Sequence, residues 1–262
     1  MSGGIDDSSF SQICDESNII STEKSQILPK TIVFIIPAFN EERVISKTIH
    51  SIRKSTNSLN SKVKIIVIDD GSTDNTANVA RSNGANVVYS HMQNRNVAGA
   101  FQSAIRLAKR YNPDIVCNFD ADGQFNAEEI ERVLMPIILG KADLVVGSRF
   151  LVNNHIPPLK KVGNKLFSYL LSNISRCKIT DASSGFRAFS KEALMHLEPL
   201  GIFTYTHESI LDVLSARLTY TEVPISVRYF AHRKSRVVKS VFRYTLKSIG
   251  VIIMKLIQLR QR

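Results

Sequence analysis

Short apolar runs alternate with amphipathic segments along the first half of the chain. Apolar runs of strand length predict strands buried on both faces, as in a parallel sheet, and segments of helical periodicity predict the helices between them. The predicted strands are Thr31–Ile36, Val63–Ile68, Asn86–Tyr89, Ile115–Phe119 and Leu144–Gly147, and the predicted helices are Glu41–Ser55, Asn75–Asn83, Ala98–Tyr111 and Ala127–Leu139. The alternation predicts an α/β fold with a mainly parallel central sheet flanked by helices, which binds ligands at the carboxyl ends of its strands.

The alternation loosens after residue 150, and both ends of the chain differ from the middle. The second half is predicted to be mostly helical, with helices at Lys161–Ser175, from Lys191 and from Glu208, a loop at Asp181–Gly185 and a strand at Thr221–Tyr229. We expect three regions: a disordered leader over residues 1–29, a folded domain over 30–236 and a basic amphipathic helix over 237–262.

Positive charge is concentrated near the C-terminus. The formal net charge is +11, and no acidic residue follows Glu222, whereas ten Lys and Arg residues lie between Arg228 and Arg262. This asymmetry indicates an anionic partner. Because no nucleic-acid module accompanies it, we expect no nucleic acid and instead an anionic membrane surface. A C-terminal helix packed on the domain with a solvated basic face explains the same pattern, and the sequence leaves both interpretations open.

Composition and cysteine spacing indicate the cellular compartment and the relation of the protein to a membrane. No apolar stretch of about twenty residues occurs, so we expect no helix to span a bilayer. The three cysteines, Cys14, Cys117 and Cys177, are widely spaced and form no C-x-x-C pair, which disfavours a disulfide framework or a thiolate zinc site. We therefore expect a cytoplasmic protein that lies peripherally on the cytoplasmic face of a membrane.

Two carboxylates follow the fourth predicted strand. In Asp120-Ala121-Asp122-Gly123-Gln124 the acidic side chains are two residues apart, so extended backbone points both toward one face. Such a pair can share one divalent cation, and its hard oxygen ligands favour Mg²⁺ or Mn²⁺ with substrate phosphates completing the shell. A solvated turn explains the same residues without a metal.

Further polar residues follow the other predicted strands. Asp69 and Asp70 can accept hydrogen bonds from a base or a ribose, although a turn capped by Asp74 is an alternative. Asn40 and Glu41 are also suited to begin a helix. Gly99 permits either a close ligand approach or tight helix packing. Basic side chains are suited to phosphate oxygens, the guanidinium fork especially, and the candidates are Arg149, Arg187, Arg233, Lys234 and Arg236.

Five sequence blocks carry a specific resemblance. They are Pro37-Ala38-Phe39-Asn40-Glu41, the Asp69 cluster, Asp120 to Gln124, Gly147-Ser148-Arg149 and Ser184-Gly185-Phe186-Arg187. In this order they resemble the family 2 glycosyltransferases of GT-A type over roughly Lys30 to Lys247, and are most similar to dolichol-phosphate mannose synthases and related polyprenyl-phosphate hexosyltransferases. One segment departs: His232-Arg233-Lys234-Ser235-Arg236 lacks a glycine that the family usually carries, which leaves its phosphate contacts uncertain.

The resemblance implies roles for individual residues. Nucleotide-sugar contacts fall on Pro37, Phe39, Asn40, Glu41, Asp69, Asp70, Gly99, Asp120, Ala121, Arg149, Arg233 and Arg236. Metal ligands fall on Asp120, Asp122 and Gln124, and catalytic roles on Asp122, Arg187, Asp181 and Glu208. Where a family member glycosylates a sugar hydroxyl, an acidic residue such as Asp181 or Glu208 is the general base. A phosphate acceptor is already anionic and needs no base.

The sequence thus predicts an inverting, metal-dependent glycosyltransferase. It is expected to move mannose or glucose from a nucleotide diphosphate sugar to a polyprenyl or dolichyl phosphate at the membrane surface. One alternative is a family 2 enzyme that acts on a sugar hydroxyl in surface polysaccharide or glycan synthesis. A second is a non-catalytic protein that binds a nucleotide sugar.

Overall fold

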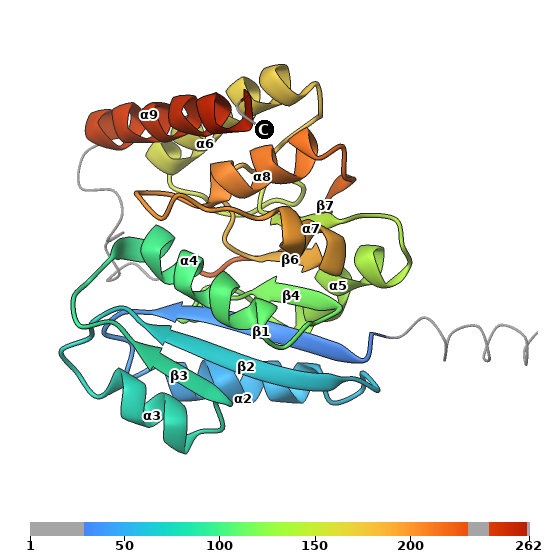
Figure 1. Ribbon diagram of the computed structural model, residues 1–262. Helices are drawn as coiled ribbons and strands as arrows, with labels where there is room; N and C mark the ends of the chain where they lie inside the picture. The colour runs from blue at the N-terminus through green and yellow to red at the C-terminus, as the bar shows by residue number, and fades with distance from the viewer. Residues whose placement is uncertain (1–28, 230–240, 261–262) are drawn as a thin grey trace, which may run out of the picture.

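A twisted sheet of seven strands forms the centre of the molecule, in the order β3-β2-β1-β4-β6-β5-β7 (Figure 1). The computed structural model of the protein describes residues 29–229 and 241–260. The strands are β1 (Thr31–Ala38), β2 (Lys62–Asp69), β3 (Val87–Ser90), β4 (Ile115–Asn118), β5 (Leu144–Ser148), β6 (Arg187–Ser190) and β7 (Tyr220–Pro224). Neighbours pair in parallel except β6, which is antiparallel to β4 and β5. The predicted α/β fold with a mainly parallel sheet is confirmed.

Helices cover both faces of this sheet (Figure 1). They are α2 (Ile45–Ser55), α3 (Thr76–Ser82), α4 (Asn96–Lys109), α5 (Ile130–Ile138), α6 (Pro158–Ser175), α7 (Lys191–His196), α8 (Thr206–Ser215) and α9 (Val241–Arg260), with a 3-10 turn η1 at Ala127–Glu129. Alternate residues of β1 point to opposite faces, so Ile32 and Phe34 belong to the core cluster that includes residues of α2, α3 and α5, while Val33 and Ile35 belong to the cluster that includes residues of α4, α6, α8 and α9. Burial on both sides explains the continuous apolar runs.

Strand β6 has no counterpart among the predicted elements. It contains four residues, Arg187–Ser190, between a loop and the start of α7. Its sequence, Arg-Ala-Phe-Ser, is not a continuous apolar run, and its position is fixed by hydrogen bonds to strands β4 and β5, which are distant in sequence. Because β6 runs against its neighbours, its first residue lies at the carboxyl end of β4, where Arg187 pairs with Asn118.

Some element boundaries also differ from the prediction. The first strand continues through Pro37, which pairs with Ile68, and the following helix begins at Ile45 rather than Glu41. The last strand ends at Pro224, and beyond it only an isolated bridge joins Val227 to Phe125. Proline at the end of β1 is tolerated because a strand end loses little from a missing N–H donor.

The C-terminal helix α9 packs on the domain and keeps an exposed face. Val251, Ile252 and Lys255 are buried, and the Lys255 Nζ lies 2.7 Å from Asp212 Oδ1 on α8. Ile253 and Ile257 remain about half exposed. Among the described residues no helix combines the length and the apolar character needed to cross a membrane. The leader, apart from Pro29, lies outside the described residues, as do Arg233 and Arg236.

Candidate active site

The polar sequence blocks converge on one edge of the sheet. Parallel strands β1, β2, β4 and β5 present their carboxyl ends there, and the antiparallel β6 presents its amino end. The loops that follow these ends hold Asn40, Asp70, Asp120 and Arg149, and the loop before β6 holds Gly185. Loop residues at such an edge are positioned by a rigid sheet, which suits them to bind a ligand.

The segment after β4 forms a turn around the candidate metal ligands. Asp122 Oδ1 accepts a hydrogen bond from the Gln124 N–H at 3.0 Å, and the buried Ala121 carbonyl accepts one from Thr48 Oγ1 at 3.2 Å. Asp120 Oδ1 lies 3.3 Å from the Asn118 Nδ2 donor. The backbone of this segment is thus held from both sides, and it carries Asp120, Asp122 and Gln124 on one short loop.

Gly185 makes room for the Asp120 carboxylate. A Cβ atom built on Gly185 would lie 2.5 Å from Asp120 Oδ2, far inside ordinary contact distance. The Asn118 amide fixes the same loop, because its Nδ2 donates to the Gly185 carbonyl at 2.7 Å and to the Tyr205 hydroxyl at 3.0 Å. The glycine of the Ser184-Gly185-Phe186-Arg187 block is therefore a packing partner of the first carboxylate in the Asp120 block.

Burial and a neighbouring like charge raise the pKa of Asp120. Burial, and then the negative charge of Asp122, raise the pKa of Asp120 to about 7, while Asn118, Arg149 and Arg187 act in the opposite direction. No cluster of three or more His, Cys, Asp or Glu side chains suited to a metal occurs in residues 29–229 and 241–260. Two carboxylates and a neighbouring amide still fit Mg²⁺ or Mn²⁺, because such ions take one or two protein carboxylates and obtain further oxygens from phosphates.

Arg149 and Asp181 form a bidentate ion pair beside this loop. Arg149 Nε donates to Asp181 Oδ2 at 2.7 Å, and the second donor reaches Oδ1 at 2.8 Å. Asp181 is fully buried, and its own N–H and that of Thr180 donate to the Glu222 carboxylate on β7. Asp181 is therefore held as the partner of Arg149, with both oxygens engaged. Its predicted role as a base stays untested.

Arg187 is completely buried. Its NH1 donates to the Thr206 carbonyl at 2.8 Å and to Ser209 Oγ at 2.7 Å, and its Nε donates to the Ser184 carbonyl at 3.0 Å. The guanidinium thus connects β6, the Ser184 loop and α8. Its positive charge still acts on Asp120, but a direct contact with a substrate phosphate stays a prediction.

The ends of β1 and β2 are fastened to each other. The Asn40 N–H donates to Ser72 Oγ at 2.9 Å, and its Oδ1 accepts from the Thr73 N–H at 2.8 Å. The Glu41 N–H donates to Thr76 Oγ1 at 2.8 Å. Pro37 and Phe39 are partly exposed beside these contacts. These residues shape one wall of the site, and their predicted contacts with a nucleoside remain to be tested.

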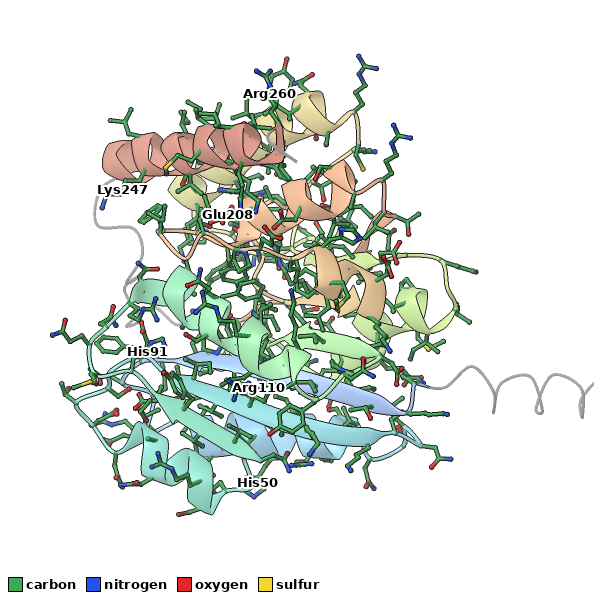
Figure 2. All side chains as sticks on the ribbon, viewed as in Figure 1. His50, His91, Arg110, Glu208, Lys247 and Arg260 are labelled. Carbon is green, nitrogen blue, oxygen red and sulfur yellow. The ribbon has the colours of Figure 1, made fainter. Side chains whose placement is uncertain are left out.

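The two neighbouring aspartates have different surroundings. Asp69 accepts a hydrogen bond from the Ser72 N–H at 3.1 Å. Asp70 accepts one from the Arg95 N–H at 2.9 Å and pairs with His91 Nδ1 at 2.7 Å. Both carboxylates are buried. Through its contacts with Arg95 and His91, Asp70 joins β2 to the segment that leads into α4 (Figure 2, where His91 is labelled).

Gly99 lies in the first turn of α4. A Cβ atom there would lie 2.7 Å from the Arg95 Cβ, so this position requires glycine for packing against Arg95. The packing alternative from the sequence therefore has direct support.

Glu208 lies on α8 among other buried charged side chains. It is buried on α8, on the side of the sheet covered by α9 (Figure 2). Its Oε2 accepts from the Leu200 N–H at 2.6 Å, and burial raises its pKa to about 7 against the opposing charge of Lys255. Glu208 therefore belongs to a buried charge cluster under α9, and its role as a catalytic base stays untested.

Four residues in or beside the site carried no sequence signal. Asn118 and Tyr205 hold the Gly185 loop, Glu222 holds the Asp181 loop, and Lys160 lies with its Nζ 4.9 Å from the centre of the Tyr229 ring. Each lies in an ordinary strand, helix or loop context in the sequence. Only the pairing of distant elements brings them to the site.

Comparisons with known proteins identify the family. The profile of glycosyl transferase family 2 matches residues 33–198. The UDP-N-acetylglucosamine–dolichyl-phosphate N-acetylglucosaminyltransferase of Methanococcus voltae is 33% identical over 231 residues, which cover 79% of this chain and 89% of that protein. The undecaprenyl-phosphate mannosyltransferase of Micrococcus luteus is 27% identical over 211 residues, which cover 74% of this chain and 82% of that protein.

A solved structure shares the fold. It is glucosyl-3-phosphoglycerate synthase from Mycobacterium tuberculosis in complex with Mn²⁺, uridine diphosphate and glucosyl-3-phosphoglycerate, with a TM-score of 0.65 and 23% identity over 86% of this chain and 80% of that chain. The resemblance predicted from the five sequence blocks is confirmed by the profile and the relatives. The chain belongs to glycosyl transferase family 2 and is a glycosyltransferase of GT-A fold.

Proposed function

We propose that the protein transfers a hexose from a nucleotide diphosphate sugar to a polyprenyl phosphate, with a divalent cation, and inverts the anomeric carbon. The observation that carries the proposal is the Asp120 to Gln124 loop at the carboxyl end of β4, beside the Arg149 guanidinium. Relatives whose names specify dolichyl phosphate and undecaprenyl phosphate acceptors support the acceptor class. The solved neighbour with Mn²⁺ and uridine diphosphate supports the donor class and the metal.

The chain's own residues would position the donor and balance its charge. Asp120, Asp122 and Gln124 would hold Mg²⁺ or Mn²⁺, which when bound supplies positive charge against the diphosphate. Arg149 adds a cation near the same loop. Asn40, Asp69 and Asp70 would line the nucleoside end, and the buried contacts around them keep these groups rigid. Positioning and charge stabilisation would then lower the barrier.

A phosphate acceptor fits the state of the two candidate bases. An acceptor phosphate oxygen would form the new bond to the anomeric carbon while the bond to the donor diphosphate breaks, and the nucleoside diphosphate leaves with the electron pair. No proton has to be removed. Both oxygens of Asp181 already accept hydrogen bonds from Arg149, and Glu208 is buried on α8, which supports a reaction that needs no base.

Enzyme assays test this proposal directly. Purified protein is incubated with radiolabelled GDP-mannose, UDP-glucose or UDP-N-acetylglucosamine and with dolichyl or undecaprenyl phosphate in detergent. We expect label to enter the organic phase with Mn²⁺ or Mg²⁺ and not with a chelator. Asp122→Ala should reduce turnover by orders of magnitude. Wild-type turnover in Asp122→Ala would refute the metal assignment, and label found only in water-soluble glycan would favour the sugar-hydroxyl alternative.

The exposed faces of α6 and α9 support action at a membrane surface, which we propose is the cytoplasmic face. The two helices lie side by side in Figure 1 and contact each other. Val162, Leu166 and Tyr169 of α6 are exposed, as are Ile253 and Ile257 of α9. Neither helix contains an acidic residue. Apolar side chains with basic neighbours suit the interface of an anionic bilayer.

Vesicle binding tests the membrane surface. We expect co-sedimentation with vesicles that contain phosphatidylglycerol and less with pure phosphatidylcholine, and we expect Leu166→Glu to weaken it. Met195→Glu on α7 is the matched control, because Met195 is at least as exposed as Leu166 (62% against 50%) but lies outside both helices. Equal loss in both variants, or a dimer in light scattering that Leu166→Glu dissolves without affecting vesicle binding, would contradict the membrane assignment.

A further inference from the structure

Lys160 is a half-buried cation on the inner face of α6, and the sequence blocks do not include it. It lies one helical turn before Asn164, which is buried, so both side chains lie on the face of α6 that packs on the domain. Asn164 Nδ2 donates to the Thr180 carbonyl at 3.0 Å, and its Oδ1 accepts from the Ser183 N–H at 3.1 Å. This face therefore holds the loop that contains Asp181.

Two cations converge where α6 begins. Lys160 Nζ lies 4.9 Å from the centre of the Tyr229 ring, and the Tyr229 hydroxyl accepts a hydrogen bond from Arg149 NH1 at 3.4 Å. Burial, and then the charge of Arg149, lower the pKa of Lys160, whereas Asp122 raises it. Lys160 is thus near enough to the Asp120 loop to feel both the second carboxylate and the arginine.

Arg149 and Lys160 differ in their ion pairs among the described residues. Arg149 has a bidentate carboxylate partner in Asp181. Within residues 29–229 and 241–260, none of the ion pairs includes Lys160. The first turn of α6 also lacks an acidic residue, and a helix N-terminus favours an anion. A partly desolvated ammonium beside a second cation is stabilised when an anionic ligand lies between them.

We propose that Lys160 is a phosphate-binding residue of the active site and that it acts together with Arg149 from the inner face of α6. The inference rests on the proposed function, and it adds a residue and an element to the site. The ligand chemistry is a phosphate group, which is present both in the donor diphosphate and in the lipid phosphate acceptor. Lys160 would contact substrate oxygens directly, as a charge-assisted donor.

The neighbouring lysine provides a matched control. Lys161 has the same side chain and is exposed on the outer side of α6. We compare Lys160→Gln, Lys160→Arg and Lys161→Gln by calorimetric binding of GDP and UDP, with and without Mn²⁺, and by KM for the sugar donor and for the lipid phosphate. Loss of one charge-assisted contact corresponds to about a ten- to hundredfold weaker binding.

Each outcome has a defined meaning. A higher Kd for the nucleoside diphosphate in Lys160→Gln assigns Lys160 to the donor, whereas a higher KM for the lipid phosphate alone assigns it to the acceptor. Lys160→Arg should recover most of the affinity, and Lys161→Gln should match the wild type. The melting temperature of ligand-free Lys160→Gln should not fall. Unchanged Kd and KM values, or a loss that tracks a lower melting temperature, would overturn the proposal.

The nucleotide-binding experiments separate this proposal from the proposed function. If the wild type binds GDP or UDP but transfers no sugar to a lipid phosphate, the proposed function fails while Lys160 is still tested by binding. If transfer occurs and Lys160→Gln performs it with unaltered constants, only the assignment of Lys160 fails. Wild-type protein that binds neither nucleotide nor lipid phosphate contradicts both.

Discussion

Replacing Gly185 with alanine should damage the candidate metal site without preventing folding. The added Cβ would lie 2.5 Å from Asp120 Oδ2 and 2.9 Å from Oδ1, whereas ordinary contact begins at 3.4 Å, so the carboxylate must move by about 0.9 Å. Gly185 does not have a positive φ, so alanine imposes no backbone strain of its own. The perturbation therefore acts on the position of Asp120.

A displacement of this size has a large expected effect on catalysis. Misplacing a catalytic group by about 1 Å can cost about a hundredfold in rate, and overpacking costs about 1–3 kcal/mol of stability. We expect Gly185→Ala to lower kcat/KM by about a hundredfold and to raise the Mn²⁺ concentration needed for half-maximal activity. The assay is sugar transfer measured over a Mn²⁺ titration, with urea unfolding measured in parallel.

Gly163→Ala on α6 is the matched control. Nothing lies within 4 Å of a Cβ built at Gly163, so alanine in this helix should leave activity unchanged and increase stability by about 0.5–1 kcal/mol. A Gly185→Ala protein with wild-type kcat/KM and an unchanged Mn²⁺ dependence would refute the reasoning. Lower stability with an unchanged Mn²⁺ dependence would show that Asp120 is a structural residue.

Three further predictions concern buried charges. Burial raises the pKa of Glu208 from 4.5 to about 7, so the native state binds more protons than the unfolded state in this range, and the free energy of unfolding falls as pH rises through it. Urea unfolding at pH 5 and pH 8 should show a smaller fall for Glu208→Gln than for the wild type, and an equal fall would contradict this. Lys255→Met leaves Asp212 buried without its cation and should lower the stability measured by thermal unfolding by about 3–5 kcal/mol. The loss should be smaller when Asp212→Asn is added, and additive losses would show that Lys255 and Asp212 are not energetically coupled. Arg149→Lys cannot reproduce the bidentate contact with Asp181 and should lower both the rate of sugar transfer and the stability of the protein. Wild-type values of both would show that the bidentate geometry of the guanidinium group is unimportant.

The sequence by itself determined six of the seven strands, the fold class and the family. Residues such as Ile32 to Ile36 are apolar without interruption because both faces of β1 are covered, so local composition already encodes a central position in the sheet. The Asp120 block was found because two carboxylates at a strand end form a local pattern. Such signals are contained in a few consecutive residues and need no knowledge of distant contacts.

Only the tertiary structure decided which of these residues face one another. Arg187 carries a guanidinium group that is suited to bind phosphate. It is nevertheless buried against main-chain carbonyls, because the antiparallel β6 directs it into the domain. Lys160 has no motif, yet α6 brings it to Tyr229 and toward Arg149. The difference is physical: a residue's chemistry is a property of its own side chain, whereas its partners, burial and charge environment come from strands and helices that pair over many intervening residues.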